Sequence, residues 1–311
     1  MGYHRRGAGK GGAMRIVRPV IINDSTLAGS NVTEESTAPL YNAGTTYALG
    51  DLSYRVGTHR VYRSLQASNL GHTPESSPTW WQEIRATDKY KMFDSKAISK
   101  TQRTDNITVS ITPNERIDVV ELLTVDASSV HVTATDAADG VVFDQTFSMV
   151  SDSGITDWYA YYFEPIVRKN KLLIDFIPPY GDLTVDIVIT DTGSTVACGE
   201  CILGLSRELG GTQYGAQVGI RDFSVKEQDE FGNFDVLERA FAKRGTFSLE
   251  VDAGFEETLH KILEDYRATA VLWIGANERP VTHIYGYYRD FQNDLALATK
   301  SYCSLEIEGL T

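Results

Sequence analysis

The chain has 311 residues, of which 42% are hydrophobic and 23% charged, which suffices for two or three globular domains. Its 42 acidic residues outnumber its 29 basic residues, giving a formal net charge of −13. This balance excludes nucleic acid as the expected partner, because binding phosphate needs a basic surface. No apolar run of the sequence approaches the roughly 18 residues that cross a bilayer, so we expect no membrane insertion.

Residues 1–40 are predicted to form an N-terminal arm. Residues 1–14 are basic and rich in glycine, and no apolar stretch typical of a secretory signal follows them. One apolar run, residues 16–22, is long enough for a strand. Met14 is an alternative translation start, so the sequence leaves open whether residues 1–13 are native.

Residues 41–88 are predicted to fold as a very small β-module. Aromatic rings recur there between short alternating runs and turn residues; they are Tyr41, Tyr47, Tyr54, Tyr62, Trp80 and Trp81. So short a segment buries little surface, and large rings must therefore supply most of its core. We expect Tyr47, Tyr62 and Trp80 to form the core, and Tyr41 and Trp81 to be exposed.

This stretch resembles the small chitin-binding type of carbohydrate-binding module. The matching positions are Tyr47, Gly50 and Asp51, then Tyr54, Tyr62, Ser64, Asn69, Gly71, Pro74, Trp80 and Trp81. The resemblance implies glycan binding, in which an exposed ring stacks on a sugar face, and Tyr41 and Trp81 are the candidates. Sugar-binding members carry a second ring just after the Tyr-x-Ser run, whereas residues 65–68 here read Leu-Gln-Ala-Ser. The alternative interpretation is a spacer or docking module.

The order of parts along the chain also resembles a tail or baseplate protein of a tailed bacteriophage or prophage. Small modules of this kind occur within such proteins, and the C-terminal run SYCSLEIEGL adds to the likeness. The resemblance implies a place in the virion tail after synthesis in the host cytoplasm. The expected partners are other tail or baseplate proteins, further copies of this chain in a symmetric ring, and bacterial surface glycan. The alternatives are a tail-associated glycan-degrading enzyme tethered by its module and a secreted lectin-like protein.

Residues 89–208 are predicted to form a jelly-roll-like β-sandwich. From residue 106 onwards, about eight short β-patterned runs alternate with Asp-Gly, Pro-Pro-Tyr-Gly and Thr-Gly-Ser turns. One of these runs, residues 158–163, is almost entirely aromatic. As a strand it would bury alternate rings in the core or against another subunit.

The three cysteines are predicted to be reduced, metal-free and buried in strands. Cys198 and Cys201 form a C-x-x-C pair with apolar flanks, and Cys303 leaves an odd count without a second ligand pair. No metal-binding, phosphate-loop or catalytic-serine motif occurs in the sequence. We therefore expect no cofactor and no catalysis.

Residues 209–311 are predicted to form an α+β assembly domain with one amphipathic helix. The helix is indicated by apolar residues in one stripe from Phe255 to Tyr266, with strands before and after it. Two β-runs at 218–225 and 235–241 flank a polar centre and predict a long hairpin. An isolated hairpin is marginal in water, so we expect a neighbouring subunit to cover it. The candidate contact residues are Phe223, Lys226, Glu230, Phe231, Phe234 and Arg239.

Overall fold

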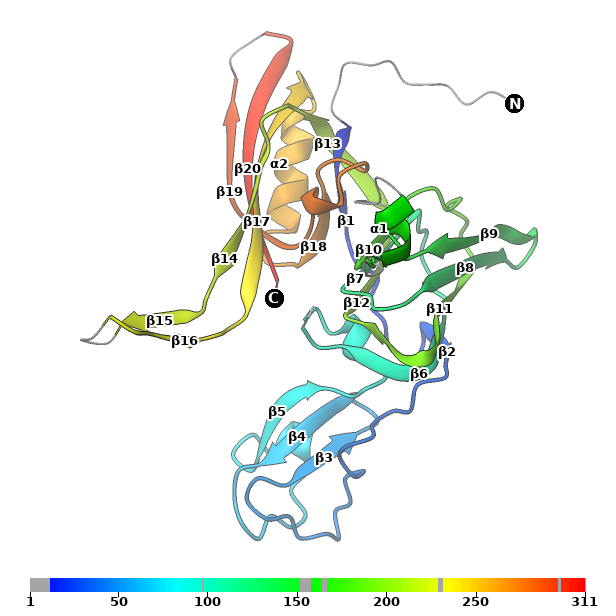
Figure 1. The fold of residues 1–311 in the computed structure, drawn as a ribbon, viewed down its shortest axis with the longest axis vertical. Helices are drawn as coiled ribbons and strands as arrows, with labels where there is room; N and C mark the ends of the chain where they lie inside the picture. Colours follow the sequence, from blue (N-terminus) through cyan, green and yellow to red (C-terminus); the bar gives the residue numbers. More distant parts are fainter. Residues whose placement is uncertain are drawn as a thin grey trace.

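The computed structural model describes residues 12–96, 98–151, 158–163, 167–228, 232–295 and 298–310, and it is mainly β. A small β-module, a β-sandwich and a C-terminal α+β domain follow one another in space, with the sandwich in the middle (Figure 1). The predicted fold class is therefore confirmed. None of the described helices is long and apolar enough to span a bilayer.

The C-terminal domain is built on a seven-stranded antiparallel sheet. In spatial order its strands are β13 (Ser206–Thr212), β1 (Ala13–Val17), β18 (Val271–Ile274), β19 (His283–Asp294), β20 (Lys300–Gly309), β17 (Phe241–Asp252) and β14 (Gln217–Asp222). A further pairing of β13 with β17 closes all of these except β14 into a barrel. Helix α2 (Glu256–Asp265) packs on the barrel core through Leu259, Ile262 and Leu263, as its apolar stripe predicts.

The segment expected to be an N-terminal arm supplies strands to two different sheets. β1 lies between β13 and β18 in the barrel, with Met14 and Ile16 in the barrel core. β2 (Leu27–Ser30) pairs instead with β6 of the sandwich. The chain therefore starts the barrel, leaves it for the whole of the sandwich and module, and returns to complete it. Local pattern predicts the strand, but a partner about 190 residues away in the chain follows only from tertiary packing.

The sandwich packs a five-stranded sheet against a three-stranded sheet. The first sheet contains β2, β6 (Thr101–Ile111), β11 (Leu183–Cys198), β8 (Ser129–Asp136) and β9 (Gly140–Ser148), in that order. The second contains β10 (Lys171–Ile174), β7 (Val119–Leu123) and β12 (Glu200–Gly204). Both sheets contribute buried aliphatic side chains to one core, among them Ile107, Leu122 and Ile187.

The three-stranded sheet also packs on the barrel, so the two domains share a buried junction. Its apolar contacts come from Val17, Val119, Leu123, Ile202, Leu272, Ile274 and Tyr285. Within the junction, His283 Nδ1 lies 3.1 Å from Glu121 Oε1, and both side chains are buried. Lys171 donates to the carbonyl oxygens of Pro280 and His283, at 3.1 and 2.6 Å. The Pro280 carbonyl belongs to a short 3-10 turn, η3 (Pro280–Thr282), and His283 follows it as the first residue of β19. Glu121 and Lys171 of the sandwich thus each contact polar groups of the barrel, so the junction holds the two domains by polar as well as apolar contacts.

The small module is a three-stranded antiparallel sheet inserted between β2 and β6. Its strands are β3 (Leu52–Arg55), β4 (Arg60–Ser64) and β5 (Trp81–Ala86), with a 3-10 turn, η1 (Pro74–Ser76), before β5. A second 3-10 turn, η2 (Lys91–Phe93), leads from the module to the sandwich. The module lies at the opposite end of the molecule from the barrel (Figure 1).

One predicted strand is a helix. Residues Trp158–Phe163 form the short helix α1, and the strand prediction for them is wrong. Rings four residues apart meet there, Trp158 with Tyr162 at 6.4 Å and Tyr159 with Phe163 at 4.8 Å, which is the neighbour spacing of a helix. All four side chains are exposed, so the predicted burial of half of these rings is not seen for them. Aromatic residues favour strands on average, and that preference misled the local prediction.

Candidate functional site

The core of the small module is a cluster of three buried rings, Tyr47, Tyr62 and Trp81. Tyr47 and Trp81 meet edge to face with centroids 5.0 Å apart, and Trp81 Nε1 donates to the His72 carbonyl at 2.8 Å. Trp81 is only 2% exposed, so the prediction that its ring is free to stack on a sugar is wrong. It begins β5 opposite Ser64, and this register turns its ring inward.

Tyr41, the other candidate for glycan binding, is half-buried and joins the same cluster. Its ring stacks on Tyr47 at 5.8 Å and meets Trp81 edge to face at 6.0 Å. The Arg55 guanidinium lies 5.4 Å from the Tyr41 ring centroid and is itself held by Glu75 through two hydrogen bonds, of 2.8 and 3.2 Å. Tyr41 therefore packs against the module core and is not a fully exposed platform for a sugar.

A ring pair that the sequence reasoning missed lies on the module surface. Trp80 and His72 are both half-buried and stack face to face, with centroids 3.9 Å apart and planes 13° from parallel. Trp80 was predicted to be core, but it lies just before β5 and only borders the buried cluster. The sequence gives two adjacent tryptophans and does not indicate which of them begins the strand. A stacked, half-exposed ring pair can pack against the apolar face of a sugar.

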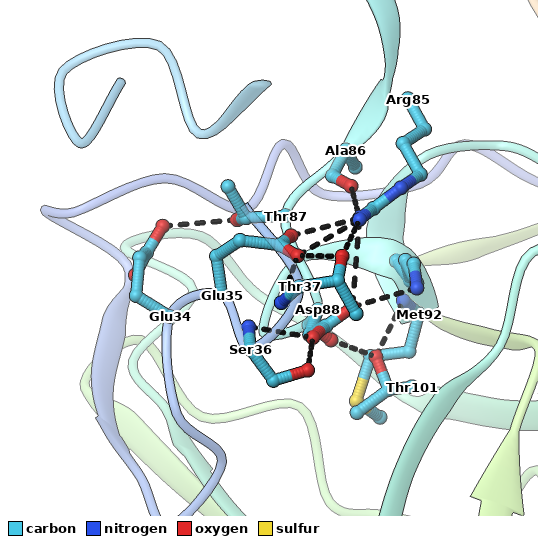
Figure 2. A network of polar contacts seen from close by, with 11 residues as sticks. Glu34, Glu35, Ser36, Thr37, Arg85, Ala86, Thr87, Asp88, Met92 and Thr101 are labelled. Atoms are coloured by element: carbon cyan, nitrogen blue, oxygen red, sulfur yellow. Dashed lines mark hydrogen bonds and ion pairs between the residues drawn. The ribbon is translucent and has the colours of Figure 1, made fainter. Parts of the chain in front are cut away.

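The module is joined to the sandwich by a dense polar network (Figure 2). The Arg85 guanidinium forms two hydrogen bonds of 2.8 Å with the two carboxylate oxygens of Glu35, whose side chain is buried. Burial acts to raise the pKa of Glu35, but hydrogen bonds from Arg85 and Thr37 outweigh it and bring the pKa to about 2. Asp88 accepts from the backbone N–H and hydroxyl of Ser36 and from Lys91 Nζ. Segments entering and leaving the module are therefore tied to each other.

A second set of contacts in this joint centres on His59, in the turn between β3 and β4. Its Nδ1 lies 2.8 Å from Glu34 Oε1, and its Nε2 lies 3.1 Å from Asp24 Oδ1. The imidazole stacks on Tyr90 at 3.8 Å, and Tyr90 donates its hydroxyl to Asp24. Asp24, Glu34 and Tyr90 all lie outside the module's three strands, so His59 fastens the module to its connecting segments.

The predicted long hairpin projects from the barrel as an arm (Figure 1). Beyond β14 and the first part of β17, strands β15 (Val225–Gln228) and β16 (Phe234–Leu237) form a separate two-stranded ribbon. Every residue of β16 is exposed, with Phe234 at 69%, Val236 at 56% and Leu237 at 58%. No strand of the described chain pairs with the ribbon's outer edges.

The predicted contact residues are distributed along this arm. Phe223 lies under the Arg221 guanidinium at 5.2 Å, and Lys226 pairs with Asp222 at 2.9 Å. Phe234 is in the ribbon, and the backbone N–H of Arg239 donates to the Ser224 hydroxyl. Glu230 and Phe231 lie outside the described residues. The structure thus brings Phe223, Lys226, Phe234 and Arg239 onto one projecting element.

Two adjacent hollows lie at the base of the arm, and both are lined by Arg289 and Glu308. One has a volume of about 330 Å³ and is mainly apolar; its other lining residues are Phe223, Ala242, Tyr287, Tyr288, Gly309 and Leu310. The other has a volume of about 190 Å³ and is more polar; its other lining residues are Ile220, Arg221, Arg244, Glu306 and Ile307. Sequence reasoning missed these hollows because they form where β14, β17, β19 and β20 meet.

The predicted burial of all three cysteines is confirmed, and none forms a disulfide. Burial raises the pKa of Cys198 and Cys201 far above the usual thiol range, and it raises that of Cys303 to about 11. Across the described ranges, no three histidine, cysteine or acidic side chains gather in a way that would hold a metal ion.

Comparison with known proteins identifies no family: no family model matches the chain, and no curated protein matches it. Among solved structures, it is similar to chitosan-binding module 1 of a chitosanase/glucanase from Paenibacillus sp. IK-5. The identity is 11% and the TM-score 0.25, over 37% of this chain and 82% of that module. A likeness at this TM-score carries no argument about function.

Proposed function

We propose that this protein is a structural subunit of a bacteriophage tail, at the tail tip or baseplate, and that it acts by assembly without catalysis. The observation that carries the assembly proposal is the arm, whose ribbon leaves Phe234, Val236 and Leu237 exposed to water. The tail location draws on the resemblance in the order of parts along the chain. Both the location and the lack of catalysis are proposals for experiment to decide.

The energetics of the ribbon favour a covering partner. A lone two-stranded hairpin is marginally stable in water, and open strand edges invite pairing with another chain. Burying one large apolar side chain is worth about 1.5–3 kcal/mol. Covering the three exposed apolar residues of β16 would therefore contribute several kcal/mol, which is a strong drive to assemble.

The arrangement of domains supports a division of labour. The arm extends from the side of the barrel, and the small module lies at the end of the molecule away from the barrel (Figure 1). The contacts of Glu121 and Lys171 with the barrel hold the sandwich on the barrel, and the Glu35–Arg85 pair ties together the segments that enter and leave the module. An assembly held by the barrel and arm would thus present the module outward on a rigid support.

Deleting residues 227–233 tests the proposal, because it shortens the arm and leaves the barrel strands intact. We expect the shortened chain to fold, as judged by circular dichroism, and to be absent from purified tails that contain the full chain. Antibody labelling of intact particles should place the full chain at the tail tip or baseplate. Incorporation of the deletion variant into infectious particles would refute the role of the arm. Release of reducing sugar from bacterial surface polysaccharide would favour the enzyme alternative.

The stacked pair of Trp80 and His72 favours a second candidate function, binding of a bacterial surface glycan by the module. Both rings are half-buried and stacked face to face, and Trp80 packs against the module core. Ring stacking on sugar faces is the usual basis of such sites. Under this proposal the tail subunit contributes to host attachment as well as to assembly, and retention on purified surface glycan tests it.

A further inference from the structure

The arm carries two surfaces that suit each other, its exposed ribbon and the hollow at its base, but the two do not meet within one chain. Its ribbon exposes Phe234, and its base holds the apolar hollow of about 330 Å³. That volume is at the lower end of the range of small-ligand sites and is large enough for an aromatic side chain. The ribbon extends away from the barrel, so it does not fold back onto its own base (Figure 1).

The charges on the two surfaces are complementary. Three acidic residues, Glu227, Asp235 and Glu238, are exposed along the ribbon. They outnumber its exposed basic residues, Lys226 and Arg239, of which Lys226 is already paired with Asp222. At the base, three arginines face two glutamates; they are Arg221, Arg244, Arg289, Glu306 and Glu308. Arg221 and Arg289 share Glu308, at 2.9 and 3.8 Å, which leaves positive charge in excess around the hollows. Complementary charges of this kind steer association and fix its register.

Building on the proposed function, we propose that the ribbon of one copy docks on the arm base of the next copy. Phe234 enters the apolar hollow beside Tyr287, and the ribbon's carboxylates lie against the arginines at its rim. The occupant is a second copy of this chain because both complementary surfaces lie on the same chain. Such a contact is head-to-tail, and it closes into a ring or continues as a filament.

The open edge of β14 adds backbone pairing to this contact. The backbone N–H of Phe223 donates to the Ala240 carbonyl, which continues the ladder between β14 and β17. Because hydrogen-bonded pairs alternate in an antiparallel ladder, the N–H and C=O groups of Val218, Ile220 and Asp222 point away from β17. Among the described strands none pairs with this edge, so it is available to an arriving strand.

A disulfide between copies tests the docking geometry. Two single variants of the full chain, Phe234→Cys and Tyr287→Cys, are mixed under mild oxidation, and we expect a covalent dimer. The native cysteines are buried with raised pKa values, so they do not compete. The matched control is Phe163→Cys with Tyr287→Cys, because Phe163 is as exposed as Phe234 but lies on α1. Cross-linking of Phe234→Cys no greater than that of the control would overturn the docking.

Sedimentation of the full chain and of Phe234→Ala provides the energetic test. Loss of an anchor residue at an interface centre should weaken self-association at least tenfold, whereas Phe163→Ala should leave it unchanged. If the wild-type chain assembles and Phe234→Ala assembles equally well, the docking is refuted and the proposed structural role survives. If purified wild-type chain stays monomeric at every concentration tested, self-docking is refuted, and incorporation into tails then decides the proposed function separately.

Discussion

Arg85 and Glu35, which are 50 residues apart in the sequence, form a two-pronged ion pair at the neck of the small module. Arg85 lies in β5, the last strand of the module, and Glu35 lies in the segment that enters it. A carboxylate with its side chain fully buried depends on this partner, because an unpaired buried charge is costly. The pair therefore determines how rigidly the module is carried.

The first prediction is that Arg85→Ala destabilises the joint by about 1–3 kcal/mol, because it leaves the Glu35 carboxylate buried with fewer donors. The measurement is the thermal unfolding of the full chain. Arg60→Ala is the matched control, since Arg60 lies 3.5 Å from the mostly exposed Glu83. A surface pair of that kind is worth about 0–1 kcal/mol. Equal effects of the two substitutions would contradict the structural role of the Glu35–Arg85 pair.

The second prediction concerns acid. The pKa of Glu35 is lowered to about 2 in the folded protein, against an ordinary value of 4.5. The lowered pKa stabilises the folded protein at pH values above 4.5, and this stabilisation is lost as the pH falls from 4.5 towards 2. Melting temperatures measured between pH 7 and pH 3 should therefore drop more for the wild type than for Glu35→Gln. Parallel curves for the two proteins would show that Glu35 does not contribute to the loss.

The third prediction concerns alkali and has the opposite sign. Burial, followed by the neighbouring charge of Asp94, raises the pKa of Glu200 from 4.5 to about 9. A raised pKa contributes stability below 4.5 that is lost progressively as the pH rises through 9. Between pH 7 and pH 10, the wild type should therefore lose stability faster than Glu200→Gln, whose amide does not ionise. Chemical unfolding at each pH measures the difference, and a Gln variant that is equally sensitive to alkali would contradict it.

The sequence predicts the parts of this fold that depend on local pattern. The apolar stripe from Phe255 to Tyr266 predicts α2, because a helix that packs on a core needs one apolar face, and alternation predicts most sandwich strands. The pairing of β1 with β13 could not be predicted, because it joins segments separated by the whole sandwich. For the candidate site, the sequence locates the aromatic module and the hairpin. The sequence does not show which of Trp80 and Trp81 is buried, because a shift of one residue exchanges the two faces of a strand.

The fourth prediction is that the native thiols do not react with a thiol reagent in the folded chain. Thiolates are the reactive species, and burial raises the pKa of Cys198, Cys201 and Cys303. Labelling followed by mass spectrometry should show an unmodified chain under native conditions and a triply labelled chain in denaturant. Rapid native labelling, or a Cys198–Cys201 disulfide in purified particles, would contradict this.

The fifth prediction separates the surface ring of the module from its core ring. Trp80→Ala should leave the melting temperature nearly unchanged and weaken retention on bacterial surface glycan, because it removes one ring of the stacked pair. Loss of one stacking platform worth about 1 kcal/mol corresponds to roughly fivefold weaker binding.

The matched comparison for this fifth prediction is Trp81→Ala, which empties the module core. Truncation of a buried tryptophan costs about 3–5 kcal/mol, so this variant should lose the module's fold and its glycan retention together. The pair of variants distinguishes binding from packing. In a spacer module, Trp81→Ala would lower the stability, and Trp80→Ala would change neither the stability nor the glycan retention. If the wild-type chain is retained on no surface glycan, or if Trp80→Ala is retained as well as the wild type, the Trp80–His72 pair is not a glycan site. The module is then a spacer or docking element, and the proposed assembly through the arm is unaffected.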